Sequence, residues 1–296
     1  MNIPYLGEFL AVATAMIWAS AVILFKKSGE TVHPIALNFF KNVLAAVLLL
    51  PSLWIFGETL ARPVPRGDYL LLLLSGALGI GVADTLFFVS LNLLGAGLSA
   101  IVDCLYSPFV IGFAMLWLGE RLTVWQFIGV VMIVSAVLEA TLRKQGNHLS
   151  RRNLWLGVLC GALSMAGTAG GIVMVKPLLE HSPILWVSEI RMFGGVIVLL
   201  VVLLFRRDRR EILRSIMVRR GWGYMVSSSF IGAYLALLFW LGGMKYSHAS
   251  VAAALNQTSN IFVFVFAAIF LRERITLQRA LGIVFGVAGA YLVTFG

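Results

Sequence analysis

The feature that most constrains this chain is a series of apolar runs, each about 20 residues or longer, that recurs along its whole length. A helix of that length crosses the roughly 30 Å hydrocarbon layer of a membrane. The runs lack the alternation of apolar and polar residues that a transmembrane barrel needs, so helices are the spanning element. Only 12% of the residues are charged. The sequence therefore predicts an all-α integral membrane protein.

Charged residues, prolines and glycines divide the apolar runs into ten expected transmembrane helices. We place them at 6–27, 34–56, 69–94, 97–118, 124–142, 153–178, 184–205, 222–245, 248–271 and 277–295. The first run has the hydrophobicity of a signal peptide, but its basic residues, Lys26 and Lys27, follow the run instead of preceding it. We interpret it as an uncleaved first helix.

Most of the 23 Lys and Arg residues fall in one alternate set of loops, most densely between Arg206 and Arg220. The positive-inside rule places this face in the cytoplasm and both termini outside. The same distribution accounts for the net charge of +10, so we expect no nucleic-acid partner. We predict a multi-pass protein of the cell membrane, the inner membrane in a bacterium, that is a monomer surrounded by lipid.

An internal repeat relates the two halves of the chain. Leu-Gly-Glu-Arg-Leu-Thr at 118–123 recurs as Leu-Arg-Glu-Arg-Ile-Thr at 271–276, an offset of 153 residues. Each half has five expected spans, and because this number is odd, the second half inserts into the membrane in the opposite orientation to the first. We therefore predict a 5+5 inverted-topology repeat with halves at 1–142 and 153–296.

These repeated residues also carry a family resemblance. The stretch from Ser99 to Pro108, the two motif copies, and Gly129 with Gly282 resemble the EamA family of the drug/metabolite transporter superfamily. The resemblance covers essentially the whole chain and implies ten helices, as a 5+5 inverted repeat, around a central cavity. It does not specify the substrate, because the family includes exporters of amino acids and many uncharacterised members.

Ionisable residues inside the expected spans are the first candidates for a binding site. Each costs several kcal/mol in a membrane unless it is paired or faces water. They are Lys41, Asp84, Asp103, Glu189 and Arg191. Lys41 and Arg191 are repeat partners, so we expect both to line one central cavity. A structural role, with backbone carbonyls and a neighbouring acid holding each cation, is the alternative.

Polar and aromatic residues near these charges complete the expected substrate site. Asn38 shares a helix face with Lys41, and Tyr106 shares one with Asp103. The second half supplies Asn256, the repeat partner of Asp103, and Asn260. Trp18 is the aromatic residue placed deepest in its helix. Interhelical hydrogen bonding is the alternative role for the polar residues.

We expect Lys41 to pair with Asp103, because both lie about two turns from the cytoplasmic surface. Asp84, near the middle of its helix, is the rival partner.

The expected function is secondary transport by alternating access, with a cavity at the midplane of the inverted repeat. We expect an exporter of a small polar metabolite such as an amino acid. Two alternatives stay open for coupling: transport is coupled to protons through Asp84, Asp103 or Glu189, or it is not coupled. The alternative is a membrane-embedded enzyme or a lipid-modifying accessory protein, but no catalytic motif occurs, and Cys104 and Cys160 are isolated. We expect no cofactor and no metal.

Overall fold

The computed structural model describes residues 5–118, 123–142, 150–217, 221–246 and 255–295. Every regular element within these ranges is a helix, which confirms the all-α prediction. Eight described segments are long and apolar enough to cross a membrane, and two further apolar helices are shorter, Val124–Ala140 and Leu255–Phe270. The ten-span arrangement stays a prediction. The first motif copy, with Glu120 and Arg121, lies largely outside the described residues.

The first half of the chain begins with two long helices, followed by helices that change direction or geometry along their length. Its elements are α1 (Leu6–Ser28), α2 (Pro34–Ile55), α3 (Arg66–Gly76), the π-helical η1 (Ala77–Ala83), α4 (Asp84–Leu94), α5 (Ala96–Asp103), α6 (Tyr106–Leu118) and α7 (Val124–Leu142). The expected span at 97–118 is therefore two helices, because the chain turns at Cys104 and Leu105.

Among the described residues, the second half follows a similar order, with one added short helix, α10, and with only the helical residues 255–257 at the place of α5. Its elements are α8 (Arg151–His181), α9 (Ile184–Phe205), α10 (Arg209–Ile216), α11 (Trp222–Ser229), the π-helical η3 (Phe230–Leu235), α12 (Ala236–Tyr246), α14 (Ser259–Phe270) and α15 (Leu277–Phe295). A turn at Thr258 separates α14 from the helical residues 255–257.

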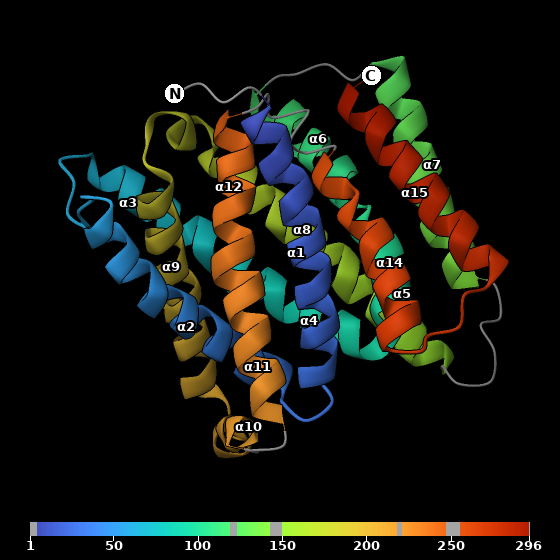
Figure 1. The fold of residues 1–296 in the computed structure, drawn as a ribbon, viewed down its shortest axis with the longest axis horizontal. Coiled ribbons are helices and arrows are strands. Elements are labelled where there is room, and N and C mark those ends of the chain that lie inside the picture. Colours follow the sequence, from blue (N-terminus) through green and yellow to red (C-terminus); the bar gives the residue numbers. More distant parts are fainter. Residues whose placement is uncertain (1–4, 119–122, 143–149, 218–220, 247–254, 296) are drawn as a thin grey trace.

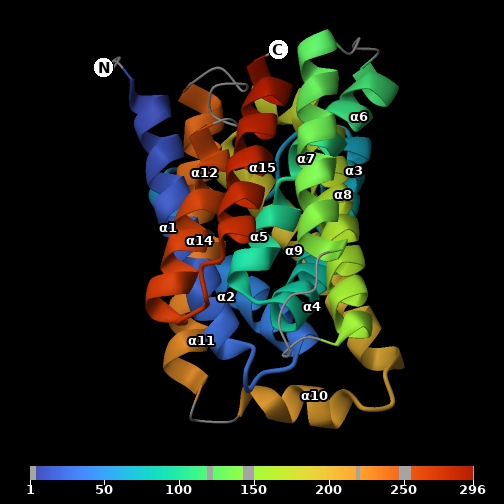
Figure 2. The ribbon, with the colours of Figure 1, turned by 90° about the vertical axis from the view of Figure 1, so that its right-hand side faces the viewer.

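The long helices run side by side along one bundle, with both ends of the described chain at the same end of it (Figure 1). The short helix α10 crosses the opposite end (Figure 2). Helices of the two halves pack against each other in matching pairs: α4 packs on α8 as α12 packs on α1, and α7 packs along α15. The bundle core thus forms between the halves as well as within them.

Two kinds of helix irregularity occur at repeat-related positions. The π-helical segments begin at Ala77 and Phe230, and the helix breaks follow Asp103 and Gln257. A π-helical turn leaves carbonyl groups without their usual α-helical partners and is often found at functional sites. Apolar periodicity alone cannot reveal such a turn, and the sequence analysis did not predict it.

The second copy of the repeated motif holds the junction between α4 and α5. The Glu273 carboxylate accepts hydrogen bonds from the backbone N–H groups of Ala96 (2.8 Å) and Gly97 (3.0 Å). The chain turns at Gly95, whose φ of +83° favours glycine. A carboxylate at a helix N-terminus satisfies free N–H groups and complements the helix dipole.

A cation holds the other side of the same junction. Lys26 Nζ donates to the carbonyl oxygens of Leu91 (3.0 Å) and Asn92 (3.1 Å) at the end of α4. The threonines that end the two motif copies cap the helices that follow, since Thr123 Oγ1 accepts from Gln126 N and Thr276 Oγ1 accepts from Arg279 N.

Candidate functional site

A cavity of about 230 Å³ lies between the two halves of the bundle. Its walls come from α1, α2, η1 and α4 to α6 of the first half, and from α8, α9, η3, α12 and the region of Asn256 in the second. Residues from the sequence-predicted site that line it are Trp18, Lys41, Asp84, Asp103, Tyr106, Arg191, Asn256 and Asn260. Asn38 and Glu189 are not in its lining.

Lys41 forms an ion pair with Asp84, not with Asp103. The distance from Lys41 Nζ to Asp84 Oδ2 is 2.5 Å, and the Lys41 side chain is 6% exposed against 25% for Asp84. The expected pairing with Asp103 is wrong, because α2 packs against α4, which begins at Asp84. Matched depth in the membrane does not reveal which helices are neighbours. Asp84, which the sequence analysis gave as the alternative partner, is the residue that pairs with Lys41.

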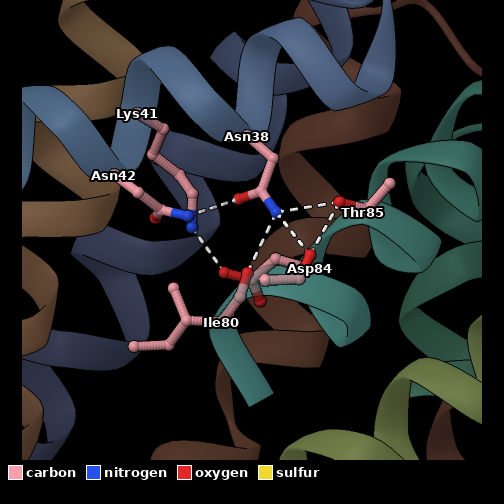
Figure 3. Close-up of polar contacts among 7 residues, drawn as sticks. Asn38, Lys41, Asn42, Ile80, Asp84 and Thr85 are labelled. Atoms are coloured by element: carbon pink, nitrogen blue, oxygen red, sulfur yellow. Dashed lines mark hydrogen bonds and ion pairs between the residues drawn. The ribbon is translucent and has the colours of Figure 1, made fainter. Parts of the chain in front are cut away.

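Asn38 supports this ion pair from the same helix. Its Nδ2 donates to the carbonyl oxygens of Ile80 and Gly81 at 2.9 Å each, and lies 3.0 Å from Thr85 Oγ1. Figure 3 shows these bonds beside the Lys41 and Asp84 side chains. Asn38 therefore satisfies carbonyl groups that the π-helical turn of η1 leaves free. This is the structural role that the sequence analysis kept as the alternative.

Arg191 brings a second cation to the cavity, and it forms no direct ion pair with a described residue. Its side chain is 5% exposed, and its Nε has no hydrogen-bond partner among those residues. The guanidinium lies against η1, where a Cβ at Gly79 would be 3.6 Å from Arg191 Nη2.

Asp103 supplies a carboxyl group to the same cavity. It is the last residue of α5, and no ion pair or hydrogen bond of its carboxylate involves a described residue. Its repeat partner, Asn256, lines the same cavity with an Oδ1 atom that also lacks a hydrogen bond. Among the described residues, the cavity thus presents a guanidinium group and a carboxyl group outside any ion pair, and an amide oxygen without a hydrogen bond.

Gln257 is a lining residue that the sequence analysis did not select. Its Nε2 donates to Ser107 Oγ at 2.7 Å, and its Oε1 accepts from Asn260 Nδ2 at 2.9 Å. The network joins the helix break of one half to that of the other. The sequence did contain a sign that Gln257 could belong to the site, because it is a polar residue next to Asn256 within an apolar span.

Aromatic side chains continue from the cavity toward the end of the bundle where α10 lies. Trp18 lines the cavity, with ring centroids 6.1 Å from Phe87 and 6.4 Å from Phe25. Farther along α1, Phe25 is fully buried, and its ring lies 4.9 Å from that of Phe88. Lys41 Nζ lies 5.7 Å from the centroid of the Phe88 ring. The ion pair and this aromatic layer are therefore in contact.

Glu189 is fully buried in α9, outside the cavity lining. Neither carboxylate oxygen has a hydrogen-bond partner among the described residues. A charged carboxylate without partners is costly in such a place.

Membrane-length helices surround a small cavity whose mainly apolar lining includes charged side chains of both signs, as in a multi-pass membrane protein. The model of the EamA-like transporter family matches residues 5–141 and 155–295. The chain belongs to this family of membrane transporters.

Relatives with the same description occur in archaea and bacteria. A protein named uncharacterized transporter from Methanothermobacter thermautotrophicus is 24% identical and aligns over 97% of this chain and 86% of its own length. The uncharacterized transporter YvbV of Bacillus subtilis is 28% identical over 75% of this chain and 70% of its own length. A crystal structure matches with a TM-score of 0.69 at 17% identity, over 96% of this chain and 94% of that one, and supports the fold.

Proposed function

We propose that this protein is a secondary transporter that exports a small zwitterionic metabolite, such as an amino acid, by alternating access. The observation that carries the proposal is the presence at one cavity of Arg191 and Asp103, neither of which forms an ion pair with a described residue. A buried charge is stabilised when a partner of opposite sign arrives. The substrate's carboxylate would contact Arg191, and its ammonium group would contact Asp103.

The arrangement of the halves supports alternating access. Five helical spans per half, at 1–142 and 153–296, would form an inverted repeat that places the site near the midplane. The π-helical segments and helix breaks at repeat-related positions give each half the same deformable points around the cavity. The aromatic layer at Phe25 and Phe88 would be the closed gate in this conformation.

Flux into proteoliposomes that contain only this protein tests the proposal. We expect counterflow of labelled zwitterionic amino acids above that of empty liposomes, and little flux of neutral sugars. An imposed pH gradient tests proton coupling, for which Asp103 is the acid that faces the cavity unpaired. No flux of any zwitterion would contradict the proposal and favour a membrane-embedded enzyme or accessory protein.

The proposed orientation places both termini outside and α10 in the cytoplasm. Single cysteines in a Cys104→Ala, Cys160→Ala background measure it through a membrane-impermeant maleimide. Because Tyr5 and Phe295 are 80% and 57% exposed, cysteines at these positions should react in intact cells. A cysteine at Arg207 should react only after permeabilisation. If the cysteine at Arg207 reacted in intact cells and those at the termini did not, α10 and the gate would face the outside of the cell instead of the cytoplasm.

A further inference from the structure

The short helix α10 differs from the other helices in composition and direction. Half of its residues, in the sequence Arg-Arg-Glu-Ile-Leu-Arg-Ser-Ile, are charged, and it lies across the end of the bundle (Figure 2). Ile212 is 2% exposed, and α10 packs against α2. The helix is therefore held on the bundle by one apolar face, while its other face is free.

The free face carries arginines without partners. In and before α10, Arg206 pairs with Asp208, and Arg209 donates to the carbonyl oxygen of Leu204. Three further arginines are exposed and form no ion pair with a described residue: Arg207, Arg210 and Arg214. Arg210 and Arg214 are one helical turn apart, so they share the face opposite Ile212.

The neighbouring apolar residues fix the depth of these arginines. Leu204 and Phe205, at the end of α9, are 66% and 86% exposed, as expected for side chains in contact with lipid. The arginines follow directly, where hydrocarbon gives way to headgroups. Leu213 and Met217 are also 40% and 76% exposed. The surface thus combines free cations with apolar side chains at the depth of phospholipid phosphates.

We propose that α10 and the turn before it are a docking surface for anionic phospholipids, whose phosphate groups bind Arg207, Arg210 and Arg214. Arginine matches phosphate through two parallel N–H bonds, and basic amphipathic helices bind anionic leaflets. Leu213 and Met217 would contact the acyl chains, which a free phosphate ion lacks. The proposal does not depend on what the cavity transports.

The lipid surface is joined to the cavity through α2. Ser215 Oγ of α10 accepts a hydrogen bond from the backbone N–H of His33 (3.1 Å), and His33 Nδ1 accepts one from Ile35 N (3.2 Å) as the N-cap of α2. Burial, and then the charge of Arg206, lower the pKa of His33, which keeps Nδ1 free to accept. Lipid bound to α10 would therefore hold the start of the helix that carries Lys41.

Titration of the purified protein with phosphatidylglycerol tests this proposal, with thermal unfolding as the readout and phosphatidylcholine as the neutral reference. We expect phosphatidylglycerol to raise the unfolding temperature. In R207Q/R210Q/R214Q the apparent lipid affinity should fall by about a hundredfold, from about fivefold per arginine near an anionic surface. The unfolding temperature in phosphatidylcholine should not change, since all three side chains are exposed.

The matched control is R151Q/R152Q/R274Q, which removes the same charge from exposed positions outside α10. We expect it to keep the phosphatidylglycerol response. If both variants lost the phosphatidylglycerol response equally, the effect would depend on net charge alone, and α10 would not be a specific lipid site. Stabilisation by inorganic phosphate equal to that by phosphatidylglycerol would overturn the lipid assignment. No stabilisation of the unaltered protein by phosphatidylglycerol would overturn the proposal as a whole.

Discussion

Asp84→Asn should lower the free energy of unfolding by about 3–5 kcal/mol, because it leaves the Lys41 ammonium group buried without a counter-charge. Lys41→Met should cost less, since the Asp84 side chain is 25% exposed against 6% for Lys41. The double variant K41M/D84N should recover most of the stability without recovering transport. Chemical unfolding in detergent, combined with flux in proteoliposomes, measures both effects.

An exposed ion pair of the same protein provides the control. Lys27 Nζ lies 3.1 Å from Glu30 Oε1, and the two side chains are 37% and 54% exposed. Lys27→Met should change stability by less than about 1 kcal/mol, because exposed pairs contribute little. If the losses from Lys41→Met and Asp84→Asn simply add in the double variant, the pair does not couple and the interpretation fails.

Arg191→Gln should reduce the apparent affinity for zwitterionic substrate by about 10- to 100-fold, as expected for the loss of a hydrogen bond to a charged group worth about 1.5–3 kcal/mol. Stability should be unchanged or higher, because Arg191 is 5% exposed and forms no ion pair with a described residue. This combination separates a substrate contact from a structural cation. Concentration-dependent flux and unfolding of the same preparation measure it.

Substrate analogues provide the control for this prediction. An amine that lacks the carboxylate should be transported equally by Arg191→Gln and the unaltered protein, whereas Asp103→Asn should impair the amine and the amino acid alike. Arg66→Gln, at an exposed position, should change neither. A large loss of stability in Arg191→Gln, with substrate affinity intact, would assign Arg191 to the framework.

Two features of the fold could not be predicted from sequence patterns: the helix breaks, and the hydrogen bonds that Glu273 accepts at the start of α5. The run at 97–118 is uniformly apolar except near Asp103, so its period cannot reveal that α5 ends there. Glu273 is one member of a repeated motif, yet its partners, Ala96 and Gly97, lie in the other half of the chain. Only the packing of α14 against α5 brings them together.

The sequence by itself determined that the chain is a helical membrane protein, because a run of apolar residues in lipid must satisfy its backbone within a helix. It also selected the charged residues around the cavity, since ionisable groups inside spans are costly without a role. Only the tertiary structure decided that Lys41 pairs with Asp84, that Arg191 and Asp103 form no ion pair with a described residue, and that Glu189 lies outside the cavity lining. Pairing depends on which helices are neighbours and on how π-helical turns rotate their faces, and neither follows from hydrophobic periodicity.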